Sequence, residues 1–238
     1  MNKYLSVTNE KNETIIIDDK YNNLALTRKI KLTDCNINKA NADKLVPYFD
    51  DLYKIEVVLN DKEYACAIGR SNKDFRIARV PVGFGLGDVY LFDEHKLYYF
   101  ANEKDLLQDV YFYVFGDIPS THTNGKGIQV FNGSGKCIFD SDYKYMNVLH
   151  AGTDDFALSD VNGKDFAIVQ NGVKSIYEVI WDSAEGLTDV TLISPCIQNN
   201  NVTRTEVFSE TRGMELEEVE YRREWDTYSY LLLDVTGY

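Results

Sequence analysis

The chain has 238 residues, of which 44% are hydrophobic and 13% aromatic, so its composition suits a folded protein with a sizeable core and excludes a disordered chain. The formal net charge is −13, and a surface this acidic repels phosphate backbones and anionic lipids. We therefore expect the protein to bind neither nucleic acid nor a membrane surface.

The amino-terminal stretch MNKYLSVTNEKNE lacks the apolar segment of a signal peptide, and no run approaches the ~20 apolar residues of a membrane span. We expect synthesis in a cytoplasm without export by the usual route. The four cysteines, Cys35, Cys66, Cys137 and Cys196, are scattered without metal-site spacing. The sequence thus predicts no metal site and no cofactor.

Strand-like runs follow one another at short intervals in the first half, separated by Gly, Asn and Asp. We predict strands at 4–8, 14–17, 24–32, 54–59, 62–68, 75–82, 88–92, 96–100 and 109–115. One helix is expected at 39–46, because Pro47 prevents its extension, and a short helical turn at 103–107.

The segment GDIPSTHTNGKG, residues 116–127, has no apolar period and is the best linker candidate. A boundary near Pro119 gives an amino-terminal β domain, 1–117, and a carboxy-terminal β domain, 118–238. The first has 16 basic and 19 acidic residues and the second 9 and 19, so their net charges are −3 and −10. Most of the negative charge therefore lies in the second domain.

The second half predicts strands at 173–181, 188–193, 202–209, 214–221 and 227–235. Asn162-Gly163 and Asn171-Gly172 are hairpin signals, and a further hairpin turn is expected at 222–224. Many short strands with few helices predict an all-β protein made of two tandem antiparallel β-sandwich-like domains.

The second domain opens with GIQVFNGSGKCIFDSDYKYMNVL, residues 127–149. Ile128, Val130 and Ile138 occupy alternating positions, which predicts two strands with one face against a core. The intervening NGSG, residues 132–135, supplies residues that tolerate positive φ in a hairpin turn. The following DSD, residues 140–142, ends the second strand because short polar side chains bond their own backbone.

A diverged copy of this sequence, YLSVTNEKNETIIIDDKYNNLAL, occupies residues 4–26. Leu5 aligns with Ile128 at an offset of 123, and Leu24 with Met146 at an offset of 122 after a one-residue slip. The repeat predicts two related domains. The alternative is that two unrelated hairpins share the same turn residues.

No stretch of the sequence forms a complete catalytic motif. GFGLGDV, residues 83–89, continues as a strand, whereas a phosphate-binding turn must open a helix. His95, His122 and His150 are far apart, and none belongs to a nucleophile or metal motif. We therefore assign no catalytic, cofactor-binding or metal-binding residue and predict that the chain is not an enzyme.

The stretch 127–149 resembles the opening of small bacteriophage virion proteins, mostly tail and minor tail proteins, which begin with Gly-Leu-Gln-Val-Phe/Tyr-Asn and continue with a Gly turn and Phe-Asp-Ser. The matching residues are Gly127, Ile128, Gln129, Val130, Phe131, Asn132, Gly135, Phe139, Asp140, Ser141 and Val148. In those proteins the motif lies near the start of the chain. Here the diverged copy, residues 4–26, occupies that place, and the motif itself lies at 127–149.

This resemblance implies a structural component of a virion, tail-associated and assembled in the host cytoplasm. Its expected partners are other virion proteins and further copies of itself, in a homo-oligomer. The matching motif defines no catalytic residue, so its residues are assigned a structural role.

Two alternatives remain open. In the first, Trp225, Tyr228 and Tyr230 line the face of a carbohydrate-binding module that attaches to a host glycan, because aromatic rings stack on sugars. In the second, the protein is a polysaccharide-degrading enzyme that uses a pair of carboxylates, and the sequence does not identify the pair.

Overall fold

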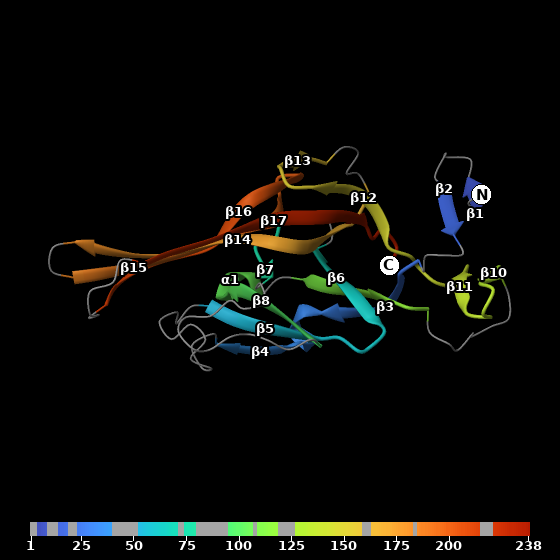
Figure 1. The fold of residues 1–238 in the computed structure, drawn as a ribbon, viewed down its shortest axis with the longest axis horizontal. Coiled ribbons are helices and arrows are strands. Elements are labelled where there is room, and N and C mark those ends of the chain that lie inside the picture. The colour runs from blue at the N-terminus through green and yellow to red at the C-terminus, as the bar shows by residue number, and fades with distance from the viewer. Residues whose placement is uncertain are drawn as a thin grey trace.

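The computed structural model describes residues 4–8, 14–18, 23–39, 52–70, 74–79, 95–106, 109–118, 127–158, 163–182, 185–214 and 221–238. The fold is all-β, as predicted, with two short helical turns, η1 (Leu32–Asp34) and α1 (Glu103–Leu106). The strands, drawn in Figure 1, are β1 (Tyr4–Thr8), β2 (Thr14–Asp18), β3 (Ala25–Lys31), β4 (Asn36–Lys39), β5 (Leu52–Val58), β6 (Glu63–Arg70), β7 (Ala78–Arg79), β8 (Lys96–Asn102), β9 (Val110–Gly116), β10 (Gln129–Phe131), β11 (Cys137–Asp140), β12 (Asn147–Gly152), β13 (Phe156–Ala157), β14 (Phe166–Asp182), β15 (Glu185–Gln198), β16 (Asn201–Met214) and β17 (Tyr221–Asp234).

Two layers of antiparallel strands enclose the main core. One layer is the four-stranded sheet β4-β5-β8-β7, and the other belongs to a nine-stranded sheet in which β3-β9-β6 adjoins β14 and β17. Ile55 and Tyr99 of the first layer lie in one buried cluster with Phe112, Ile168 and Leu232 of the second. Successive strand residues point to opposite faces, so one face of each layer supplies this core.

The two halves of the chain repeat one order of pairing. In the first half β3 pairs with β9 and β9 with β6, as β12 pairs with β17 and β17 with β14 in the second. The order β5-β8-β7 in the four-stranded sheet corresponds to β13-β16-β15 in the nine-stranded sheet. The hairpins β1–β2 and β10–β11 begin the two repeats, and both β3 and β12 carry a one-residue bulge, at Thr27 and Leu149. This order supports the predicted duplication.

The repeats meet through their inner strands. Strand β6 pairs with β14, with Ile68 opposite Ile168, and both isoleucines are fully buried. The buried cluster that contains them draws side chains from both 1–117 and 118–238. The two halves therefore share one sheet and one core. The predicted boundary at Pro119 lies outside the described residues.

A second contact joins the segments that lead into β3 and β12. The Leu26 N–H donates to the Lys144 carbonyl at 2.7 Å, and the Met146 N–H donates to the Leu24 carbonyl at 2.9 Å. Leu24 and Met146 are the residues that the repeat alignment makes equivalent. Equivalent parts of the two repeats thus face each other at both junctions.

A buried glutamine ties the layers together. The Gln170 amide nitrogen donates to the carbonyls of Ile77, at 2.7 Å, and Pro195, at 2.8 Å, while its oxygen accepts the Arg79 N–H at 2.7 Å. All three amide hydrogen-bonding partners come from outside β14, which offsets the cost of burying a polar side chain.

The hairpin turn predicted at Asn171-Gly172 is wrong. Asn171-Gly172 does not form a hairpin, because β14 runs unbroken from Phe166 to Asp182 and pairs with β17 on both sides of this dipeptide. The ladder register shifts there, so the glycine lies at a bulge. Asn162 lies outside the described residues. Of the described strands, those on either side of Asn162-Gly163 do not pair with each other, since β13 pairs with β16 and β14 pairs with β17, β15 and β6.

The hairpin predicted at 222–224 is also wrong. These residues lie inside β17, and β17 pairs with β12 and β14 whereas β16 pairs with β13 and β15. The helical turn predicted at 103–107 is confirmed by α1. The predicted helix at 39–46, apart from Lys39 at the end of β4, and the predicted strand at 88–92 lie outside the described residues. In the part of the chain that the structure describes, no helix has the length and apolar character needed to cross a bilayer.

Candidate assembly surfaces

The motif residues come together in one hairpin, β10–β11, whose turn is closed by a side chain. The Asn132 side-chain oxygen accepts the N–H groups of Ser134, at 3.1 Å, and Lys136, at 2.9 Å. Gly135 has φ +80°, a conformation that glycine adopts without strain. The predicted turn at 132–135 is therefore found, and the asparagine supplies the hydrogen bonds that hold it.

A buried carboxylate holds the other end of the hairpin. Asp140 is 2% exposed, and its two oxygens accept hydrogen bonds from the Gln129 side chain at 2.8 Å and the Asp142 N–H at 2.9 Å. The Tyr145 hydroxyl donates to the Asp140 carbonyl at 2.9 Å. Burial raises the pKa of Tyr145 to about 12, so its hydroxyl stays protonated across the neutral range.

Ser141 and Gly127 close the hairpin at its first residues. The Ser141 hydroxyl oxygen accepts the Ile128 N–H at 2.8 Å, and the Ser141 N–H donates to the Ile128 carbonyl at 2.9 Å. Gly127 has φ +118°, and a Cβ at this position would lie 2.3 Å from the Ser141 hydroxyl. Only glycine fits here without displacing that serine.

The hairpin has a small core of its own. Ile138 and Phe139 are buried, Val130 and Tyr145 pack against them, and the Phe139 and Tyr145 rings stack with centroids 5.0 Å apart. Ile128, expected on the core face, is instead 62% exposed, because it precedes the first paired residue of β10. The core-face prediction was right for Val130 and Ile138 and wrong for Ile128.

Large apolar side chains remain on the outside of this hairpin and of the next strand. Ile128 and Phe131 are 62% and 51% exposed, and Val148 and Leu149 in β12 are 43% and 45% exposed. The polar residues of the motif bond within the hairpin, so they fix its shape and leave these apolar groups as its outward features. Exposed apolar groups on a rigid element are typical of protein–protein contact sites.

The hairpin is fastened to the body at its base. Lys136 forms an ion pair with Asp117 at 3.0 Å, and Tyr145 makes an isolated bridge with Ala25. The Tyr238 hydroxyl donates to the Tyr145 carbonyl, and the Tyr238 ring contacts Phe115 edge-on. In Figure 1 the hairpin appears at the same end of the molecule as β1–β2.

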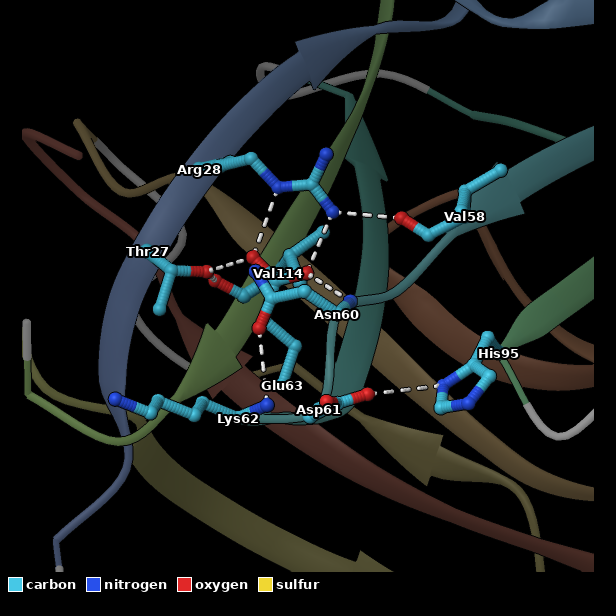
Figure 2. A network of polar contacts seen from close by, with 9 residues as sticks. All are labelled: Thr27, Arg28, Val58, Asn60, Asp61, Lys62, Glu63, His95 and Val114. Carbon is cyan, nitrogen blue, oxygen red and sulfur yellow. Dashed lines mark hydrogen bonds and ion pairs between the residues drawn. The ribbon is translucent and has the colours of Figure 1, made fainter.

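A second polar network, shown in Figure 2, joins the bulge of β3 to the start of β6 across the intervening strand β9, and sequence reasoning missed it. The Glu63 carboxylate, 1% exposed, accepts two hydrogen bonds from Arg28, at 2.8 and 2.6 Å, one from Thr27 at 2.7 Å and one from the Asn60 N–H at 3.0 Å. Arg28 also donates to the Val58 carbonyl at 2.7 Å. Thr27 reaches Glu63 because it is the extra residue of the β3 bulge.

Each carboxylate oxygen of Glu63 accepts two of these hydrogen bonds, which leaves neither oxygen open to a substrate. Burial acts to raise the pKa of Glu63, but the hydrogen bonds from Arg28, Asn60 and Thr27 outweigh it and hold that pKa below its ordinary value. A carboxylate that stays charged and fully bonded suits a structural role, since a general acid needs a raised pKa.

The remaining candidate groups do not converge. Among the described residues, no group of three or more His, Cys, Asp or Glu side chains could hold a metal ion. His95 is exposed beside Asp61, at 3.7 Å, and His150 stacks on Phe156 with ring centroids 3.9 Å apart. His122 lies outside the part of the chain that the structure describes.

Two of the three aromatic residues considered for sugar binding are in the core. Tyr228 and Tyr230 are 4% and 1% exposed. Arg204 lies over the Tyr228 ring at 4.7 Å, and the Tyr230 hydroxyl donates to the Asp154 carbonyl at 2.8 Å. These two rings therefore present no open face to a sugar.

The sequence and the fold were compared with models of known protein families, with curated proteins and with solved structures, and no match was found.

Proposed function

We propose that this protein is a structural component of a bacteriophage virion, tail-associated, that acts through protein–protein assembly and catalyses no reaction. The resemblance of residues 127–149 to the opening of phage tail proteins suggests the setting. The observation that supports the role best is the motif hairpin, whose polar side chains bond within it while Ile128 and Phe131 face outward.

The chemistry of the motif fits a building block. The side chains of Asn132, Asp140 and Ser141 each accept backbone N–H groups of the same hairpin, so they form their hydrogen bonds within the chain. A virion subunit needs a rigid surface of this kind, because rigid partners lose less conformational entropy on assembly.

The test is the presence of the protein in particles. Antibody raised against the purified chain should label virions of the encoding virus in immunogold electron microscopy, at the tail, whereas pre-immune serum should not. Mass spectrometry of gradient-purified particles should detect its peptides. Failure to find the protein in particles, while it is abundant in the infected-cell lysate, would contradict the proposal.

A glycan array distinguishes the sugar-binding alternative. A scaffold should bind no glycan above background, and saturable binding to one glycan class would favour that alternative instead.

A further inference from the structure

The two repeats differ most in the length of corresponding strands. The strands β6, β8 and β9 have 8, 7 and 7 residues, whereas their counterparts β14, β16 and β17 have 17, 14 and 14. The first repeat completes its share of the core with the shorter strands. The extra length in the second repeat is therefore not needed to close the core.

The extra length forms a four-stranded arm, with strand order β17-β14-β15-β16, that projects from the body in Figure 1. Strand β6 pairs with β14 at Ala167 and Ile168, and beyond the bulge at Gly172 the neighbour of β14 is β15. The paired stretch from Lys174 to Asp182 spans about 30 Å, at roughly 3.3 Å per residue.

At the base of the arm, one face is buried and the other carries an ion pair. Leu192, 1% exposed, continues the buried side of β15, on which Ser194 is also fully buried. On the opposite side Lys174 and Asp226 form an ion pair at 3.4 Å. Cross-strand partners share a face, so the ladder extends both faces outward.

The face continuous with Leu192, here called the arm apolar face, is rich in aromatic and aliphatic positions. Val179 is paired with Thr188 and with Tyr221, and Val190 is paired with Tyr177 and with Glu210. The register places both tryptophans of the chain, Trp181 and Trp225, on this face.

The opposite face is mainly acidic, with Ile176, Ile180 and Leu187 among its aliphatic positions. Its register positions include Glu178, Asp182, Glu185, Asp189, Glu224 and Asp226, against Lys174 and Arg222. The arm apolar face instead includes Glu210, Arg212 and Arg223. Two copies of a chain with net charge −13 repel through acidic surfaces, so the apolar face is the side on which two arms can approach.

We propose that the arm apolar face is a self-association surface, on which the arm of a second copy of this chain packs face to face. The proposal deepens, and rests on, the assembly role argued above. Two sheets packed in this way stack about 10 Å apart, as in a β-sandwich.

The size of the face suits such a dimer. The described pairing of β17 with β14 reaches Val179, whereas β15 pairs with β14 as far as Asp182. Three to four strands about 4.8 Å apart and nine residues of about 3.3 Å each give a face of roughly 15–20 by 30 Å. A standard interface buries about 800 Å² of accessible surface per partner, which a side-chain-covered face of this extent can provide. The same patch serves both copies, as a twofold interface requires.

The experiment uses the full chain and two neighbouring residues of β14. Val179→Lys introduces a charge on the arm apolar face, and Ile180→Lys introduces it in the same strand on the opposite face. Sedimentation velocity over a concentration series should show dimers of the wild type, a dissociation constant raised at least about tenfold in Val179→Lys and little changed in Ile180→Lys. Circular dichroism establishes that both variants are folded.

Two further measurements keep the test decisive if Val179→Lys fails to fold. Thr188→Lys alters a position of the same face that is already polar, and it should weaken the dimer in the same direction. Wild-type tryptophan emission should shift to longer wavelength on dilution, because both tryptophans lie at positions of this face. A wild type that is monomeric at about 100 µM, or equal weakening by Ile180→Lys, overturns the proposal.

The outcomes separate this proposal from the assembly role itself. A monomeric chain that is nevertheless found in virions would end the arm proposal alone. Dimers formed through the arm by a chain absent from virions would support the arm proposal and end the virion assignment.

Discussion

Ile68 of β6 lies opposite Ile168 of β14, and both side chains are fully buried at the junction of the two repeats. Each belongs to the same cluster as core residues from the other half of the chain. This pair therefore makes the stability of each repeat depend on the other.

Truncating this pair should destabilise the whole protein. Ile168→Ala removes buried methyl groups at a site enclosed from both repeats, so we expect a loss of about 2–5 kcal/mol in the free energy of unfolding, measured by urea denaturation. Ile128→Ala is the matched control, because Ile128 is 62% exposed, and it should change stability by less than about 0.5 kcal/mol. An Ile168→Ala effect as small as the control would contradict a shared core.

The Gln170 amide should be needed for the contact between layers. Gln170→Leu keeps the approximate volume but leaves the Ile77 and Pro195 carbonyls and the Arg79 N–H without this partner. Such buried groups cost about 1–3 kcal/mol each when unpaired, so thermal unfolding should shift downward by several degrees. An unchanged melting temperature would mean that other groups replace these bonds.

Loss of the Asp140 carboxylate should loosen the motif hairpin locally. Asp140→Ala removes the acceptors for Gln129 and for the Asp142 N–H, while the main core does not include this hairpin. Hydrogen exchange should show lost protection of amides in 128–142, with global stability lowered by less than about 1 kcal/mol, because a unit outside the main core can open locally. Asp142→Ala, which keeps Asp140, is the control. Equal loss of protection in β9 and β17 would argue against a local role.

Acidification should weaken the network around Glu63. Folding lowers the pKa of this carboxyl from its ordinary value of 4.5, so the charged form stabilises the native state above that pH. The contribution should disappear as the pH falls below 4.5 through the lower folded-state pKa. Glu63→Gln should cost about 1–3 kcal/mol at pH 7, and its deficit relative to the wild type should shrink toward pH 3. A deficit that is constant with pH would show that charge is not involved.

The sequence predicted the parts of the fold that depend on neighbouring residues. The hairpin at Asn132 was predicted correctly because its turn is held by residues two and four positions away. The repeat was visible because similar residues recur in the same order. The structure supports it, since the aligned residues Leu24 and Met146 are hydrogen-bonded to each other through their backbones. Local turn chemistry and periodicity are sufficient for such features.

The features that were missed depend on distant residues. Asn171-Gly172 has the composition of a turn, but pairing with β17 on both sides keeps it in a strand as a bulge. The Arg28–Glu63 pair is separated by 35 residues, so no local pattern reveals it. The exposure of Ile128 likewise follows from where pairing begins, which alternation does not specify.

Native-state hydrogen exchange tests the union of the two repeats most directly. Under increasing denaturant, the amides of β9 and β17 should exchange through one global opening, with the same free energy, and Ile168→Ala should lower both values equally. If β9 retained its protection while β17 exchanged at a lower free energy, or the variant affected one strand alone, the two halves would be independent units.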